Sequence, residues 1–213
     1  VYPVEIIVEP DSDPNDPEEV YIINTAPEIG GIQFTKRGDD GQLLKDAVFV
    51  IRSGFSTASD PIATAKSNEN GVVTFYPLDE GNYTIQEISA PNGYVLNNTA
   101  YTATVKAQQF TTINHGDDVV NEKNEATLTV EKQVQVKDTE SPQSIKNYPN
   151  SIDDFENAFA IQRKLTIDPD TAWTTVTGME SLFLDENGRI IQKVEKYQTD
   201  DNNQITGTWE YRV

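Results

Sequence analysis

The sequence is short of the residue types that many catalytic and metal-binding sites require. Its 213 residues include no cysteine and a single histidine, His115. The chain can therefore form no disulfide, no thiolate metal site and no cysteine nucleophile. One histidine is too few for a multi-histidine metal site, and a serine–histidine triad would have only His115 to use. We expect neither a metal nor a cofactor, since the sequence also lacks a phosphate-binding glycine-rich loop.

Basic residues and long apolar runs are also scarce. Lysine and arginine total 16 against 35 aspartate and glutamate residues, which gives a formal net charge of −19. Nucleic acid and anionic membrane surfaces would repel so acidic a chain. No run is apolar enough to insert into a bilayer, and we recognise no signal peptide or C-terminal anchor. The strand pattern is already under way at Val1 and still running at Val213, so we expect a piece of a longer polypeptide.

Helical periodicity is nearly absent, and short alternating apolar–polar runs fill the chain instead. Apolar residues make up 36% of the sequence, which favours a globular protein over a disordered one. Turn-forming dipeptides separate the runs: Asp40-Gly41, Asn70-Gly71, Glu80-Gly81, Asn92-Gly93 and Asn187-Gly188. Alternation punctuated by such turns is typical of strands in antiparallel sandwiches. The predicted fold class is therefore all-β, built from immunoglobulin-like or prealbumin-like sandwiches.

The strand candidates divide the chain into three parts. Residues 1–27 hold two short strand candidates and an acidic, proline-containing segment, which we interpret as the tail strands of a preceding domain plus a linker. Residues 28–123 hold about seven strand candidates, enough for a full sandwich. Residues 124–213 restart the pattern, because Leu128, Val130 and Lys132 repeat the order of Ile32, Phe34 and Lys36. We predict a second, similar sandwich there, truncated at its C-terminal end.

Three polar residues stand where the alternation predicts apolar ones: Lys36, Glu87 and Asn121. Each ends a run of alternate apolar residues, with Ile32 and Phe34 before the lysine, Tyr83 and Ile85 before the glutamate, and Val119 before the asparagine. Alternate side chains of a strand share a face, so all three point into one core. Burying a lone charge there costs several kcal/mol, roughly. That cost falls away if the lysine and the asparagine become one neutral amide.

An intramolecular Lys36–Asn121 isopeptide bond is the hypothesis that the pattern favours. Burial disfavours the ammonium, so it would help to generate the neutral amine that attacks, and it would also keep Glu87 protonated. A protonated Glu87 could then activate the asparagine carbonyl and pass a proton to the departing ammonia. The bond would join two residues that lie 85 positions apart in the sequence. The residues alone leave an alternative open, in which Lys36 reaches solvent from an edge strand and forms an ordinary ion pair with Glu87.

Three segments within residues 30–123 carry a family resemblance. They are Gly31-Ile32-Gln33-Phe34-Thr35-Lys36, the stretch Tyr83-Thr84-Ile85-Gln86-Glu87-Ile88-Ser89-Ala90-Pro91-Asn92-Gly93-Tyr94, and Val119-Val120-Asn121-Glu122. In this order they resemble the lysine strand, the glutamate strand with its Ala-Pro-x-Gly-Tyr sequence and the closing strand of CnaB-type domains. These domains build Gram-positive pilins and cell-wall-anchored adhesins.

The resemblance implies a function as well as a fold. It implies Lys36 and Asn121 as bond partners and Glu87 as the catalytic acid of a reaction that occurs once, so the protein is not an enzyme in the turnover sense. It also implies a stalk or shaft segment of a sortase-anchored protein at the cell wall or in a pilus. The expected partners are other pilin or adhesin domains. The alternative function is an adhesin module that binds a host extracellular-matrix protein or glycan, and a third is an accessory module of a secreted hydrolase.

Further candidate residues follow from weaker likenesses to the same family. Lys132 resembles the lysine of a second cross-link, and Asn24 resembles the terminal asparagine of a preceding domain. Val1-Tyr2-Pro3-Val4 is similar to the segment through which sortases join shaft pilins, but Val4 replaces the lysine nucleophile, which would favour an ancillary subunit.

The end of the chain suggests how the second sandwich would close. Residues 173–195 resemble a looser family pattern that ends on an acid-bearing strand, here with Glu195, although Glu195 lies on the wrong side of the local alternation. We expect Trp209-Glu210-Tyr211-Arg212-Val213 to be the closing strand of the second sandwich.

Overall fold

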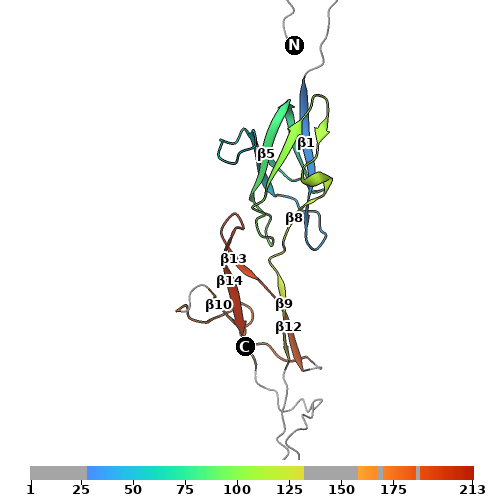
Figure 1. The fold of residues 1–213 in the computed structure, drawn as a ribbon. Helices are drawn as coiled ribbons and strands as arrows, with labels where there is room; N and C mark the ends of the chain where they lie inside the picture. The colour runs from blue at the N-terminus through green and yellow to red at the C-terminus, as the bar shows by residue number, and fades with distance from the viewer. Residues whose placement is uncertain (1–27, 132–157, 167–169, 186–187) are drawn as a thin grey trace, which may run out of the picture.

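The computed structural model describes residues 28–131, 158–166, 170–185 and 188–213 (Figure 1). Within these ranges the chain consists of strands and loops with one short 3-10 turn at Asn114–Gly116, and it has no α-helix. No helix in the described ranges could therefore cross a bilayer. The all-β fold class expected from the alternation is confirmed, and the strands form two successive groups that are arranged end to end.

One of the two sheets of the first group is antiparallel, with its strands in the order β3-β2-β5-β6. Its strands are β2 (Val48–Ser53), β3 (Ala63–Lys66), β5 (Gly81–Ser89) and β6 (Ala100–Val105). Tyr83, Ile85 and Glu87 of β5 are buried on one face, as the period of two predicts for a sheet with one covered face. Thr84, on the other face, is also buried, and its hydroxyl donates to the Gly54 carbonyl oxygen at 2.7 Å. This sheet carries the glutamate strand near the centre of the first sandwich.

The opposite sheet is built around the first strand, β1 (Ile29–Gly38). It also contains β4 (Val72–Asp79), β7 (Phe110–Thr111) and β8 (Val119–Asn121). β4 runs antiparallel along one edge of β1, whereas β7 and β8 run parallel to its other edge, one after the other. The first and last strands of this group are therefore direct neighbours, which places the two ends of an 85-residue segment side by side.

The core of the first sandwich lies between these sheets. Phe34 of β1 meets Phe49 of β2 edge to face, with ring centroids 5.0 Å apart. Such aromatic pairs add about 0.5–1.5 kcal/mol to the effect of burial. The remaining core residues are aliphatic or aromatic side chains from both sheets: Ile32, Ala47, Ile51, Val73, Phe75, Leu78, Tyr83, Ile85, Ala103, Val105, Ile113 and Val119. A well-packed apolar layer of this kind surrounds any polar group that points inward.

The second group repeats the pairing order of the first. Its strands are β9 (Ala126–Glu131), β10 (Gln162–Leu165), β11 (Thr174–Thr175), β12 (Arg189–Val194), β13 (Tyr197–Thr199) and β14 (Ile205–Arg212). β9 pairs with β12 as β1 pairs with β4, and the order β11-β10-β14 matches β3-β2-β5. A tandem of sandwich-type units is thus present, while the domain bounds 28–123 and 124–213 stay a prediction.

The turn before β4 and the turn before β12 have the same hydrogen bond, so the repeat extends to the turns. Asn68 Oδ1 accepts the Val72 amide at 3.0 Å before β4, and Asp185 Oδ1 accepts the Arg189 amide at 2.9 Å before β12. In each turn a glycine with positive φ precedes the strand, at Gly71 and Gly188. Glycine suits that position because other residues rarely adopt positive φ. The same turn chemistry therefore begins the strand next to β1 and the strand next to β9.

One expectation about the second group was wrong. Residues Trp209 to Arg212 belong to β14, which lies between β10 and β13 and does not pair with β9. This position corresponds to β5, the glutamate strand, and not to the closing strand β8, which runs parallel to β1. Alternation reports which face of a strand is buried, but it does not report which neighbour the strand takes. The mistake arose because strand order is decided by tertiary packing.

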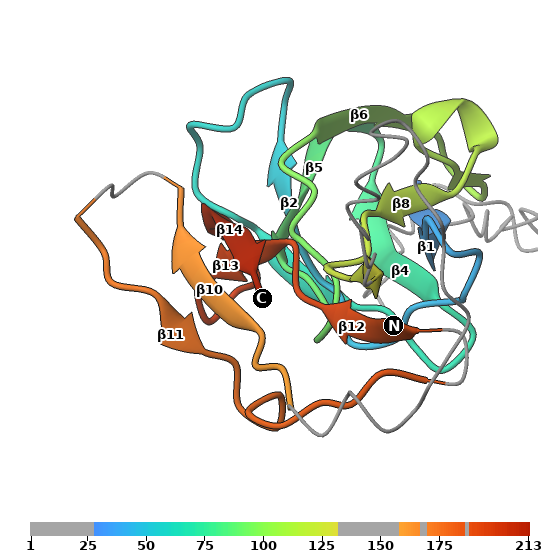
Figure 2. The same ribbon diagram turned by 90° about the horizontal axis from the view of Figure 1, so that it is seen from below.

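The two groups meet through a short connection and a hairpin turn. Only a few residues separate Asn121, the end of β8, from Ala126, the start of β9. Figure 2, seen from below, shows β12 and the β10–β14 sheet in front of the strands of the first group. The turn between β13 and β14 donates and accepts hydrogen bonds with the loop that follows β5, as described below. The second group therefore contacts the first at the end where the glutamate strand finishes.

Candidate cross-linking site

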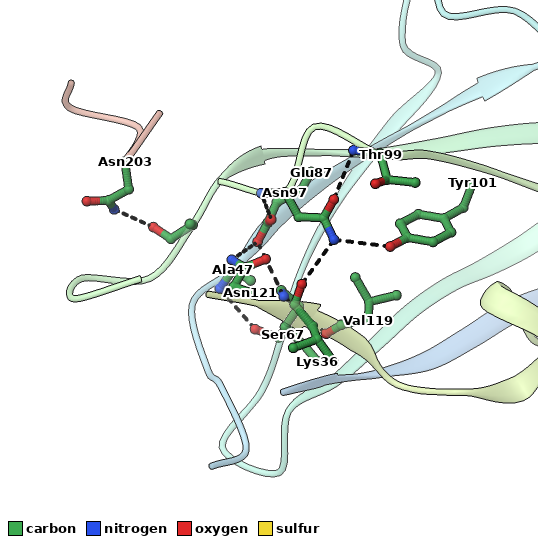
Figure 3. A network of polar contacts seen from close by, with 12 residues as sticks. Lys36, Ala47, Ser67, Glu87, Asn97, Thr99, Tyr101, Val119, Asn121 and Asn203 are labelled. Atoms are coloured by element: carbon green, nitrogen blue, oxygen red, sulfur yellow. Dashed lines mark hydrogen bonds and ion pairs between the residues drawn. The ribbon is translucent and has the colours of Figure 1, made fainter. Parts of the chain in front are cut away.

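The three polar residues singled out in the sequence lie together in the first sandwich. Lys36 comes from β1, Glu87 from β5 and Asn121 from β8, and their exposed fractions are 0%, 2% and 1%. Figure 3 shows their side chains converging between the two sheets. The sequence-based prediction that all three point into one core agrees with this placement. The alternative in which Lys36 reaches solvent does not fit a fully buried lysine.

Distances show that the two nitrogens share one carboxylate oxygen. Lys36 Nζ lies 4.0 Å from Glu87 Oε1, and Asn121 Nδ2 donates a hydrogen bond of 2.9 Å to the same atom. Lys36 Nζ also donates to the Val119 carbonyl oxygen at 3.1 Å. Glu87 is thus hydrogen-bonded to the amide and lies at ion-pair distance from the amine.

Strand register explains the convergence. β8 runs parallel to β1 with Val119 opposite Lys36 and Asn121 opposite Gly38. Residues 36 and 38 of β1 share a face, because side chains alternate along a strand, so the lysine and the asparagine face the same interior. Gly38 leaves that position without a side chain, and a Cβ there would lie 2.4 Å from the Tyr94 ring. A glycine opposite the asparagine therefore allows this close packing.

Burial moves the pKa values of the lysine and the glutamate towards each other. It lowers the pKa of Lys36 to about 8, against the opposing effect of the negative charge on Glu87. Burial also raises the pKa of Glu87, although Lys36 and the hydrogen bonds from Asn97 and Asn121 act in the opposite direction. Both shifts favour the neutral forms, because a poorly solvated site penalises charge. Moving a proton from the ammonium to the carboxylate therefore costs less here than it would in water.

The asparagine amide is only half satisfied. Asn121 Oδ1 is buried and accepts no hydrogen bond within the described part of the chain. A buried acceptor without a donor costs about 1–3 kcal/mol. Half a turn of the amide would bring Oδ1 against Glu87, where a protonated carboxyl group could donate to it. The site thus offers the carbonyl a proton donor only when Glu87 is neutral.

Asn97 is a further residue of the site that the sequence analysis missed. Its backbone amide donates to Glu87 Oε2 at 3.0 Å, and its side-chain Nδ2 donates to the Val120 carbonyl oxygen at 3.0 Å and to Tyr101 Oη at 3.1 Å. Asn97 therefore ties the glutamate to the strand that carries Asn121, as Figure 3 shows. Its place in a loop after the Ala-Pro-Asn-Gly-Tyr sequence was the available signal, but no alternation marks it.

The loop at residues 90–97 is fixed on several sides. The Tyr94 hydroxyl donates to both carboxylate oxygens of Asp40, at 3.0 and 2.9 Å. Burial and the Asp40 carboxylate raise the pKa of Tyr94 to about 12, so this hydroxyl remains a donor at neutral pH. The Val95 amide donates to the Glu122 carbonyl oxygen at 2.9 Å, just after the end of β8. These contacts connect the family-like sequence to both ends of the site.

The other residues named from the sequence are not part of this cluster. Lys132, Asn24 and Val4 lie outside the described residues, so they remain predictions. Glu195 is exposed and forms an ion pair of 2.9 Å with Arg163 on the surface of the second group. It therefore lacks the buried setting that Glu87 has. His115 is an exposed residue of the 3-10 turn.

A family comparison covers the first sandwich. The family model SpaA, described as a prealbumin-like fold domain, matches residues 30–119. Over these residues the first sandwich is similar to that family, and because of this likeness it is called the SpaA-type domain below. Lys36 and Glu87 of the SpaA-type domain lie within the matched residues, while Asn121 follows two residues after the match ends.

Solved structures that align with part of the chain include a Bacillus anthracis protein and two pilins. The Bacillus anthracis TIE protein aligns over 87% of this chain and 31% of its own length, at 20% identity and a TM-score of 0.42. BcpA, the major pilin subunit of Bacillus cereus, aligns over 48% and 31%, at 21% identity and a TM-score of 0.40. A streptococcal ancillary pilin aligns over 86% and 55%, at 18% identity and a TM-score of 0.40. The chain thus covers about a third to about half of these proteins. No curated protein matches the chain significantly.

Proposed function

We propose that the SpaA-type domain is a covalently braced stalk segment, closed by an isopeptide bond between Lys36 and Asn121. The observation that carries this proposal is the buried lysine whose amine approaches the same glutamate oxygen as the amide nitrogen of Asn121. A lysine with no exposed surface, together with a buried amide oxygen that lacks a donor, is costly in a purely structural role. Conversion of both groups into one amide removes the buried charge.

The chemistry needs only the three side chains. The neutral Nζ of Lys36 attacks Cγ of Asn121, so that an Nζ–Cγ bond forms while the Cγ–Nδ2 bond breaks. Protonated Glu87 donates a hydrogen bond to the carbonyl oxygen as negative charge develops there. Glu87 then relays a proton from Nζ to Nδ2, which leaves as ammonia, and the carboxyl group ends the reaction protonated as it began. Fixed positions on three strands replace a chance encounter, an effect worth up to roughly 7–11 kcal/mol in well-aligned cases.

The position of the bond supports a mechanical role. β1 is the first strand of the domain and β8 the last, and the two are parallel neighbours. A tensile force entering along β1 would pass from Lys36 through the bond into Asn121 and on towards β9. The chain between Lys36 and Asn121 would then carry little load. This arrangement suits a segment that transmits tension between its neighbours.

The wider setting follows from the kinds of protein that share the fold. The matched family and the pilin subunits with a similar arrangement point to a structural role in a Gram-positive pilus or adhesin stalk. Its partners are then other pilin or adhesin domains, and its place is the cell wall or the pilus, held there through sortase anchoring. A second cross-link at Lys132, which lies outside the described residues, is part of the same proposal.

A second candidate function rests on the exposed side of the second group. The Trp173 ring has two cations beside it, Lys164, whose Nζ is 5.0 Å from the ring centroid and also pairs with Glu210, and Arg212, whose guanidinium is at 4.4 Å. A cationic and aromatic surface is unusual in a chain with net charge −19, and it is a plausible site for a host protein or glycan. Binding of the whole chain to matrix proteins and glycans, compared with Trp173→Ala, tests this function.

Intact mass tests the cross-link directly. We expect the wild-type chain to be lighter than its sequence mass by one ammonia, and Glu87→Gln to keep the full mass. Glu69→Gln is the matched control, because this glutamate is exposed and pairs only with Lys45 at the surface. Digestion should recover one branched peptide that joins Lys36 to Asn121. A wild-type chain of full sequence mass would refute the bond, and loss of two ammonias would add the second link at Lys132.

A further inference from the structure

The second group of strands holds the loop of the cross-linking site through one turn. Asn203, between β13 and β14, donates from its side-chain Nδ2 to the Ala90 carbonyl oxygen at 2.6 Å. The backbone oxygen of Asn203 accepts the Leu96 amide at 2.8 Å, and the backbone oxygen of Asn202 accepts the Ala90 amide at 3.1 Å. Both ends of the 90–97 loop are therefore bound by the same turn.

The same loop holds the glutamate of the first domain. Leu96, bound by Asn203, directly precedes Asn97, whose amide donates to Glu87 Oε2 at 3.0 Å. Ala90, bound at the other end, is three residues after Glu87 itself. Figure 3 shows Asn203 reaching the loop from the side opposite the Glu87–Asn121 contact. A continuous path of two hydrogen bonds and one peptide unit thus runs from the second group to the carboxylate.

The turn is organised before it meets the loop. Asp200 Oδ1 accepts the amides of Asn202 and Gln204 at 2.9 Å each, which fixes the turn internally. Asn203 adopts a positive φ of 63°, a conformation that asparagine tolerates better than most residues. The backbone of the turn is therefore fixed before docking, so that docking loses little backbone conformational entropy.

We propose that Asn203 is a positioning residue for the Lys36–Asn121 reaction, through which docking of the second group sets the orientation of Glu87. This role rests on the proposed isopeptide bond. Asn203 touches none of the reacting atoms, and it acts through Leu96 and Asn97. Bond formation in the first domain is then fast only after the following domain has folded and docked. The order matters for a tandem stalk, because each link would close on a unit whose neighbour is already in place.

The experiment follows ammonia loss over time in the full chain. Newly synthesised protein is quenched in denaturant at intervals, and the linked fraction is read from intact mass. In Asn203→Asp a carboxylate replaces the donor and repels the Ala90 oxygen, so we expect roughly tenfold slower linking, in keeping with the effect of small misplacements on rate. Asn203→Gly removes only the side-chain bond and keeps the positive φ, so its rate should be intermediate. Gln198→Glu adds the same charge at an exposed position of β13 in the same hairpin and should link at the wild-type rate.

Hydrogen exchange separates positioning from a general loss of stability. In Asn203→Asp the amides of Leu96 and Asn97 should exchange faster, while those of Ile32 and Ile85 in the core strands keep their wild-type protection. Equal linking rates in Asn203→Asp and the wild type would overturn the positioning role alone. Equal acceleration of loop and core amides would also overturn it, because the residue would then act on the whole fold. A wild-type chain that never loses ammonia would overturn the proposed function, and this role with it.

Discussion

β5 of the first domain and β14 of the second group occupy the same place in the same order of strands, yet they bury very different residues. In β5, Tyr83, Ile85 and Glu87 face a closed core, whereas β14 has only Gly207 buried and leaves its other side chains partly or fully exposed. Within the described residues β9 has only β12 as a partner, while β1 has strands on both edges. Strand pairing alone therefore does not build a buried cluster of lysine, glutamate and asparagine. The site needs the closing strand, which both seals the core and supplies the asparagine.

Removal of Glu87, the buried acid of the first domain, should have the largest effect on stability. Glu87→Ala should lose the link, worth about 4–5 kcal/mol if it acts as a disulfide does on a loop of order 100 residues. It also leaves the Lys36 amine buried without a carboxylate, and breaking a buried pair costs about 3–5 kcal/mol. The free energy of unfolding, measured with guanidinium and circular dichroism, gives the sum of these two losses.

Lys36→Met separates the two contributions. Methionine keeps an apolar stem of similar length and removes the charge, so this variant should lose only the stability of the link. Lys45→Met, at an exposed lysine, is the control and should unfold as the wild type does. If Lys36→Met were as stable as the wild type, no link would be stabilising the domain.

A substitution in the apolar core should cause the next largest loss of stability. Phe49→Ala removes a fully buried ring that contacts Phe34, and we expect a loss of about 3–5 kcal/mol from the lost burial and the cavity. Phe183→Ala, in the second group, truncates a ring that is 63% exposed and should change stability by less than about 0.5 kcal/mol. Urea unfolding of both variants compares the two regions. Similar losses would contradict the difference in burial described above.

The pH dependence of an unlinked chain should reveal the buried lysine. In Asn121→Ala, Lys36 keeps its amine, and its pKa is about 8 in the folded state against an ordinary value near 10.5. Between these values the unfolded chain binds more protons, so stability should rise with pH, by on the order of 3 kcal/mol at most. Glu87 has the opposite sign, since its raised pKa makes stability fall as pH rises above the ordinary glutamate range.

The measurement for this variant is the unfolding free energy from pH 7 to pH 10. The double variant Lys36→Met, Asn121→Ala lacks the titrating amine and should show no such rise. A rise of equal size in both chains would assign the effect to other groups.

The smallest effect should come from the acid of the second group. Glu195→Gln breaks an exposed ion pair with Arg163, and pairs of this kind contribute about 0–1 kcal/mol. Relative to its own sequence mass, this variant should lose as many ammonias as the parent does, since this glutamate has no buried lysine beside it in the described structure. If the parent loses an ammonia that Glu195→Gln retains, this exposed glutamate takes part in a link after all.

The sequence was enough to predict much of the first domain. Alternation at Ile32, Phe34 and Lys36 predicted a buried lysine, and the same argument predicted Glu87 and Asn121 in the interior, where the structure places all three. Alternation works here because a sheet with one covered face sorts side chains with a period of two. The pattern also indicated two tandem sandwiches, because the run that begins β9 repeats the run that begins β1.

Other features were decided only by tertiary structure. Asn97 and Asn203 lie in turns, where no periodicity marks a residue, and their contacts depend on chain segments far apart in sequence. The place of β14 beside β10 was misjudged for the same reason, since a strand's sequence does not name its neighbour. The sequence determined which side chains would be buried, because burial follows local alternation. Which buried groups meet, and what holds them in place, was decided by the packing of distant strands and loops.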